Sequence, residues 1–255
     1  MRITTRGCIA VAGLLGSLTL FSESTAAADL EMSCHSTSSA KPGRQNGANV
    51  ATTPCKTESV TAGVASMHLL DLPIVNNGLL TVTIPVDLQV IGSEKNTGND
   101  TTYTDLNGVQ YDFAMASLFV NEAQLFIDHV LVMTVSDIDA GAFAPGQIPS
   151  GTTPCLAYAS DGPPIGVLIG GHFGLTHSSI GSVTLVNGAV YKPGDKPMNV
   201  ALPHGVTARL NYIKRTSANN FYSADVIPVY LDTGNVATSI EVWDLYTASA
   251  CRSVG

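Results

Sequence analysis

Charged residues are scarce in this sequence. They make up 13% of the 255 residues, about half of the roughly 25% found in typical globular chains. Lysine and arginine together number 12 against 20 aspartates and glutamates, which gives a net charge of −8. A chain with so little positive charge has no basic field to attract phosphate backbones. The composition therefore argues against nucleic-acid binding, while the hydrophobic fraction of 45% predicts a folded chain with an ordinary core.

Long hydrophobic runs are also lacking, with one exception at the N-terminus. Two arginines precede an apolar run at 9–21, and three alanines at 26–28 follow it. These are the three parts of a secretory signal peptide, so we expect residues 1–28 to be removed by cleavage after Ala28, with Ala27 as the alternative site. A retained N-terminal anchor helix is the competing interpretation. No later run approaches the roughly 18 apolar residues of a spanning helix, so we expect no transmembrane segment and a secreted, periplasmic or cell-surface protein.

Cysteine is rare, and its count becomes informative once the signal peptide is removed. The four cysteines that remain are Cys34, Cys55, Cys155 and Cys251. An even number in an exported chain indicates two disulfides. Three pairings are open, of which we favour Cys34–Cys55 within an N-terminal loop region at 29–60, and Cys155–Cys251. A zinc site is the weaker alternative because the sequence has no Cys-x-x-Cys pair.

Helical periodicity is absent after residue 60, where apolar and polar residues alternate instead. This alternation, with turn-forming residues between the apolar runs, predicts an all-β chain. We expect residues 61–255 to form an antiparallel β-sandwich or barrel-like domain stapled by the two disulfides. The glycine and proline content of 139–165 predicts a long connection. Two smaller sheets joined through that connection are the alternative.

Two long apolar runs, at 109–120 and 124–135, are expected to pair as a hairpin that turns at 121–123. Good helix formers at 114–135 make a helix the competing prediction. The β-branched residues at 130–135 and the lack of a capping signal favour strands.

A polar, glycine-containing stretch at 94–102 predicts a surface loop. The apolar run before it, at 79–91, contains Pro85. Because proline cannot donate a hydrogen bond to a ladder, Pro85 indicates an edge strand, a bulge or a break.

Metal ligands in a recognisable pattern are few. The strongest local candidates are His172 and His177, which flank a glycine-containing stretch. Five positions apart, they would lie on opposite faces of a regular strand and converge only in a loop. Zinc or copper would need one or two further ligands, and ordinary loop residues are the favoured interpretation. Calcium is the other candidate metal, at Asp137 and Asp139, but the closing glutamate of a full calcium loop is missing. We expect no cofactor.

Tryptophan occurs once, at Trp243, three residues before Tyr246. Aromatic rings on a sandwich face can stack on sugars, so these two residues are the candidates for glycan binding. A lone tryptophan near Cys251 is more typical of a core residue packed beside a disulfide. The remaining tyrosines are scattered along the chain and predict no aromatic platform.

Local signatures of catalysis are missing as well. The sequence contains no G-x-S-x-G, no H-E-x-x-H, no P-loop and no dinucleotide fingerprint. Proteins rich in β structure usually protect strand edges with lysine, proline or inward charges, and this chain has few basic residues for that purpose. We therefore expect a non-catalytic structural or adhesive subunit, or a binding module, that self-assembles or pairs with a cell-surface partner through strand edges. The alternatives are a secreted metal-dependent enzyme or metal-binding protein centred on His172 and His177, and a carbohydrate-binding module.

Overall fold

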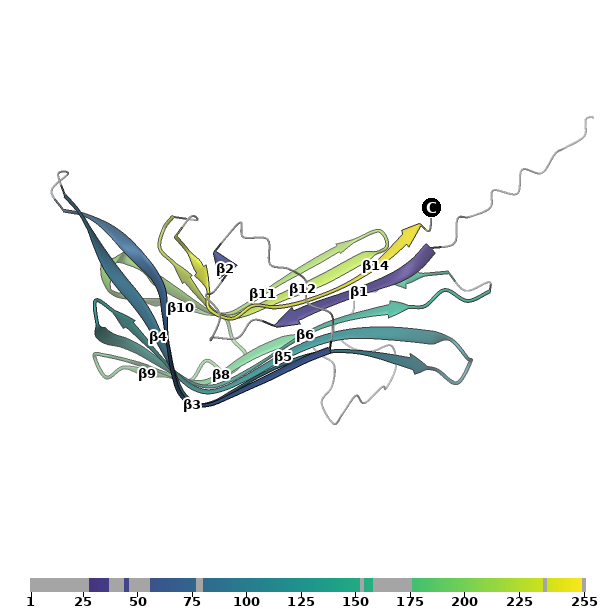
Figure 1. The fold of residues 1–255 in the computed structure, drawn as a ribbon, viewed down its shortest axis with the longest axis horizontal. Helices are drawn as coiled ribbons and strands as arrows, with labels where there is room; N and C mark the ends of the chain where they lie inside the picture. The colour runs from purple at the N-terminus through teal and green to yellow at the C-terminus, as the bar shows by residue number, and fades with distance from the viewer. Residues whose placement is uncertain are drawn as a thin grey trace, which may run out of the picture.

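Two antiparallel β-sheets lie face to face and form an elongated sandwich (Figure 1). The computed structural model describes residues 28–36, 44–45, 56–76, 80–151, 154–157, 176–235 and 238–253. Strands account for most of these residues, and the helical structure within them is limited to a 3-10 turn at Pro203–Gly205. The predicted all-β antiparallel class is confirmed. Of the predicted signal peptide, all but Ala28 lies outside the described residues.

Sheet A combines the first strand with strands from the C-terminal half of the chain. In spatial order it contains β1 (Ala28–Ser36), β14 (Leu245–Ser253), β12 (Phe221–Asp232), β11 (Thr207–Ala218) and β10 (Met198–Ala201). Two short strands extend it beside β12, namely β13 (Ile240–Glu241) and β2 (Arg44–Gln45). Every neighbouring pair is antiparallel.

Sheet B is a meander of long strands. In spatial order it contains β3 (Lys56–Asn76), β4 (Leu80–Thr104), β5 (Gln110–Ile127), β6 (Val130–Gln147), β8 (His177–Leu185) and β9 (Val190–Tyr191). The short strand β7 (Leu156–Ala157) pairs with β6. Figure 1 shows the β3–β4 hairpin reaching beyond the other strands at one end of the sandwich.

The core lies between the sheets, where β1, β12 and β14 cover β5, β6 and β8. On β5, Leu118 and Val120 point inward and are buried, while Phe119 between them is exposed, as a strand with one covered face requires. The sheets approach closely at Gly146 of β6, where an added methyl group would lie 2.5 Å from Cδ1 of Leu30. Alternation along each strand therefore places one continuous apolar layer inside the sandwich.

The first strand corrects the prediction of a loop region at 29–60. The structure places β1, β2 and the start of β3 in this segment. Met32 of β1 packs against the core, and Cys34 belongs to it. The charged residues between the apolar ones occupy the outer face, so their presence does not prevent a strand.

The predicted hairpin forms, but it turns at a different place. β5 continues through 121–123 to Ile127, and the turn consists of Asp128 and His129, with φ of 54° and 61°. Left-handed residues at both positions fit a two-residue turn whose twist matches the strands. The glycine that usually marks such turns is absent here, which explains the misplaced prediction. The strand assignment is confirmed, and the helical alternative is wrong.

The predicted loop at 94–102 is also wrong, because these residues lie in β4 between β3 and β5. Glu94 and Asn96 are buried, and Asn96 Nδ2 donates a hydrogen bond to Glu94 Oε1 over 2.7 Å. Polar side chains that satisfy each other can occupy an inner face at acceptable cost. Pro85 lies inside β4 opposite Asp71 of β3, so it does not break the strand; its missing N–H costs no bond to β5, because the β4–β5 pairing begins at Val86.

The predicted connection at 139–165 begins later than expected, because 139–147 belong to β6. β6 pairs with β8 only as far as Gly141. Pro145 lies beyond that point, so its missing N–H leaves no bond to β8 unmade. Of the remainder, 148–151 and 154–157 are described, and 158–165 lie outside the described residues.

Candidate functional site

The histidine of β8 is the described half of the predicted metal pair. His177 Nε2 lies 3.6 Å from Oδ1 of Asp139 on the neighbouring strand, and both side chains are partly exposed. His172 lies outside the described residues. Within the ranges that the structure describes, no group of three or more His, Cys, Asp or Glu side chains is arranged to hold a metal ion. Zinc or copper binding at His172 and His177 thus stays a prediction.

The predicted calcium ligands lie on the exposed part of β6. Asp137 has a φ of 55° and is left out of the β6–β8 ladder, whereas Asp139 pairs with Ser179. The described residues place no third acidic side chain with them. Calcium binding here also stays a prediction.

A second histidine cluster, which the sequence analysis did not single out, lies at a bend of sheet B. His68 Nδ1 lies 2.8 Å from Oδ1 of Asp87, and its Nε2 lies 3.5 Å from Oδ1 of Asp71. The cluster borders a hollow of about 340 Å³ that is also lined by Phe126 and His129. Because both ring nitrogens of His68 face carboxylates, neither is placed to accept a proton from a hydroxyl nucleophile. The arrangement is a surface cluster of one histidine and two aspartates.

Trp243 lies in the core. Its side chain is 0% exposed, whereas Tyr246 of β14 is half-buried. A fully buried ring offers no face on which a sugar could stack. The preferred interpretation of Trp243 as a core residue agrees with this burial.

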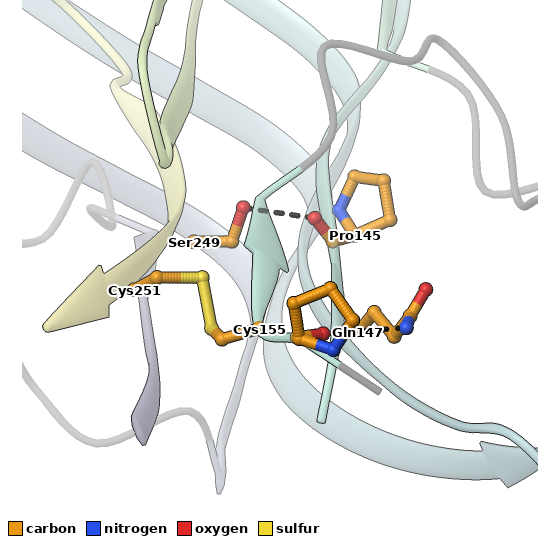
Figure 2. Close-up of a disulfide and its surroundings, with 6 residues drawn as sticks. Pro145, Gln147, Cys155, Ser249 and Cys251 are labelled. Atoms are coloured by element: carbon orange, nitrogen blue, oxygen red, sulfur yellow. Dashed lines mark hydrogen bonds between the residues drawn. A yellow bond between two sulfur atoms is a disulfide. The ribbon is translucent and has the colours of Figure 1, made fainter. Parts of the chain in front are cut away.

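The predicted Cys155–Cys251 disulfide is present and links the two sheets (Figure 2). Cys251 lies on β14 of sheet A and Cys155 immediately precedes β7 of sheet B, with 5.8 Å between their Cα atoms. Beside it, Ser249 Oγ donates a hydrogen bond to the Pro145 carbonyl over 2.8 Å. The other predicted partner, Cys55 for Cys34, lies outside the described residues.

Two tyrosines that are far apart in sequence meet on the outer face of sheet A. The ring centroids of Tyr212 and Tyr230 are 6.3 Å apart, with the planes tilted by 31°. The guanidinium carbon of Arg209 lies 5.9 Å from the centroid of Tyr230, and the same guanidinium forms an ion pair with Asp232. These residues come from two strands, β11 and β12, so no local pattern in the sequence reveals the cluster.

A kink at Asn211 brings these side chains to one face. Arg209 and Tyr212 are three positions apart, so regular alternation would place them on opposite faces. Asn211 has a φ of 56° and a buried side chain, which reverses the alternation after Leu210. Its amide donates to the carbonyls of Gly194 and Lys196 over 2.8 and 3.0 Å and accepts from Ser178 Oγ over 2.8 Å. The kink is thus held by three hydrogen bonds.

The carboxylate of Asp232 is held in its charged form. The backbone N–H of Gly234 donates to Oδ1 over 2.9 Å, and this bond is the main cause that lowers the pKa of Asp232 below its usual 3.8. The nearby Arg209 guanidinium and the Ser239 hydroxyl lower it further, against an opposing effect of burial. The cluster therefore carries a balanced pair of charges.

The outer edge of sheet B is the longest open edge among the described strands. β3 spans 21 residues and, within the described part of the chain, pairs only with β4. Between 57 and 67 it contains one charged residue, Glu58, and no proline. Val60 and Val64 on this stretch are 62% and 65% exposed.

The other three edges are protected by the usual means. β9 and β10 have two and four residues, and β1 carries Asp29 and Glu31, which are exposed. Short strands and charged side chains both discourage pairing with another chain. Even β3 is protected after residue 67, by a register shift at Leu69 and by Pro73.

Comparison with protein-family models, with curated proteins and with solved structures finds no match to this chain. Within the described residues, no helix has the length and apolar character needed to cross a membrane.

Proposed function

We propose that this is an exported, non-catalytic β protein that self-assembles through the open edge of β3. The observation that supports the proposal is the contrast between this edge and the other three. An unprotected edge presents a row of unpaired N–H and C=O groups, which is a template for another strand. The stretch 57–67 provides such a template over eleven residues.

A second copy of the same chain is the partner that fits the edge best. Two identical strands can pair antiparallel about a two-fold axis, so that one surface serves both copies. With only Glu58 charged between 57 and 67, the pairing brings few like charges together. Val60 and Val64 of both copies would lose exposed apolar surface, which favours association.

The test is the association state of the mature, oxidised protein, measured by sedimentation equilibrium over a range of concentrations. We expect a concentration-dependent oligomer whose dissociation constant rises at least tenfold in Val64→Lys, because lysine on an edge strand opposes pairing. Val186→Lys is the matched control, since Val186 is 66% exposed but lies in the β8–β9 turn.

A wild-type protein that stays monomeric at high concentration would contradict the proposal. An equal effect of both substitutions would contradict it too, because the loss would then reflect added charge and not the β3 edge. Binding of a different cell-surface protein through β3 would overturn the choice of a second copy as the partner, but it would support β3 as the binding edge.

A further inference from the structure

The tyrosine cluster on sheet A has the composition of a ligand site, and the proposed assembly does not use it. Tyr212 is 41% exposed, and it packs at an angle against Tyr230. Arg209 and Asp232 flank the rings and pair with each other. We propose that this cluster binds a neutral carbohydrate.

The two rings supply the apolar part of such a site. One face of a sugar ring consists of C–H groups, which pack against the face of an aromatic side chain. Tyrosine also offers a hydroxyl at its end, so a single side chain contacts both the C–H face and the sugar hydroxyls. Tyr212 provides the more exposed ring, and the partly buried Tyr230 ring, which has Arg209 over it, extends the contact surface at a centroid distance of 6.3 Å.

The charged pair supplies the polar part. A guanidinium carries five N–H donors in a fixed plane, and the hydrogen bond to Asp232 occupies one of its nitrogens. The Asp232 carboxylate, held charged by Gly234, accepts hydrogen bonds. Donors and acceptors side by side match neighbouring hydroxyls of a sugar, which both donate and accept.

The balance of charge selects the class of ligand. The positive charge of Arg209 is compensated by Asp232, and Glu241 lies opposite Tyr230 in the β12–β13 pairing, so the cluster offers no uncompensated positive charge to an anion. A neutral sugar loses nothing by this compensation. An acidic sugar would need a cation that is free of a carboxylate partner.

The kink at Asn211 also supports the proposal. A non-glycine residue with φ near +56° is uncommon in a strand, and such residues persist where the surroundings fix them and concentrate at functional sites. Here the three side-chain bonds of Asn211 fix it. Its consequence is that Tyr212 shares a face with Arg209.

The test uses the mature oxidised protein and a panel of neutral hexasaccharides made of glucose, xylose, mannose or N-acetylglucosamine, with binding followed by isothermal titration calorimetry. We expect at least one member to bind, and Tyr212→Ala to weaken it at least tenfold. Tyr191→Ala is the matched control, because Tyr191 is also 41% exposed but lies on β9 of sheet B.

Arg209→Lys keeps the positive charge but removes the planar guanidinium. We expect this variant to bind more weakly and to remain folded, as measured by circular dichroism. Failure of every panel member to bind would overturn the proposal, as would equal losses in Tyr212→Ala and Tyr191→Ala. Tighter binding of an acidic hexasaccharide would overturn the assignment to neutral sugars. Repeating the titration with Val64→Lys keeps this test separate from assembly through β3.

Discussion

The body of the sandwich and the β3 edge differ in how far their apolar side chains are buried. In the body, sheet A covers β5 and β6, and Val120, Ile138 and Trp243 are fully buried. On β3, Val60 and Val64 remain largely exposed, and one side of the strand lacks a described neighbour. The apolar side chains of the body are therefore already buried within the molecule, where they stabilise the fold. The edge retains backbone groups and apolar surface that no described strand covers.

The largest expected effect comes from emptying the centre of the body. Trp243→Ala should lower the free energy of unfolding by about 3–5 kcal/mol, because a large buried ring is replaced by a cavity. Val64→Ala at the edge should change it by less than about 0.5 kcal/mol. Chemical denaturation at a concentration that keeps both variants monomeric measures the two values. Similar losses in both variants would remove the distinction between body and edge.

The disulfide should matter almost as much, since it ties the two layers of the body together. Cys155 and Cys251 are separated by 96 positions, and removing a bridge of this kind costs about 2–5 kcal/mol. We expect the double variant Cys155→Ser/Cys251→Ser to unfold at a lower denaturant concentration than the oxidised wild type. Its assembly through β3, measured by sedimentation while folded, should remain. Loss of assembly without loss of stability would show that association through β3 depends directly on the disulfide.

The smallest effect concerns a charge on the surface of the body. Because the pKa of Asp232 is lowered in the folded state, its ionised form stabilises the fold above pH 3.8, and that contribution is lost as the pH falls through the lower, folded-state value. We expect Asp232→Asn to be less stable than the wild type at pH 7, with the difference shrinking in strong acid. Thermal unfolding at a series of pH values measures this. A difference that stays constant with pH would exclude the ionised carboxylate as its cause.

Alternation of apolar and polar residues carried the prediction of strands, and it succeeded where each strand has one covered face. It failed at 94–102, where Glu94 and Asn96 are buried and joined by a hydrogen bond. It failed again at Pro145. A proline is tolerated there because the pairing of β6 with β8 extends only to Gly141. Both failures depend on neighbours that are distant in sequence, which local pattern does not reveal.

The tyrosine cluster could not be predicted for a related reason. Period-two reasoning separates Arg209 from Tyr212, and the left-handed Asn211 that unites them is fixed by Ser178 and by carbonyls of the β9–β10 segment. Asparagine tolerates this conformation better than most residues, but an asparagine in a strand does not by itself predict a left-handed backbone. In contrast, the cysteine count predicted disulfides, and of the three open pairings the favoured Cys155–Cys251 bond is confirmed.

The antiparallel pairing of β1 with β14 has a mechanical consequence. Ala28 lies opposite Ser253, so a pulling force applied through these two residues acts at the same end of the pair and opens its hydrogen bonds one after another, like a zipper. The Cys155–Cys251 bridge removes the 96-position span that it closes from the path of the force, whereas the chain from Ala28 to Cys155 remains in that path. At about 3.3–3.6 Å per residue, roughly 300 Å of chain is thereby withheld from extension, so β8 to β12 are shielded by the bridge while β1 and β3 to β6 carry the load.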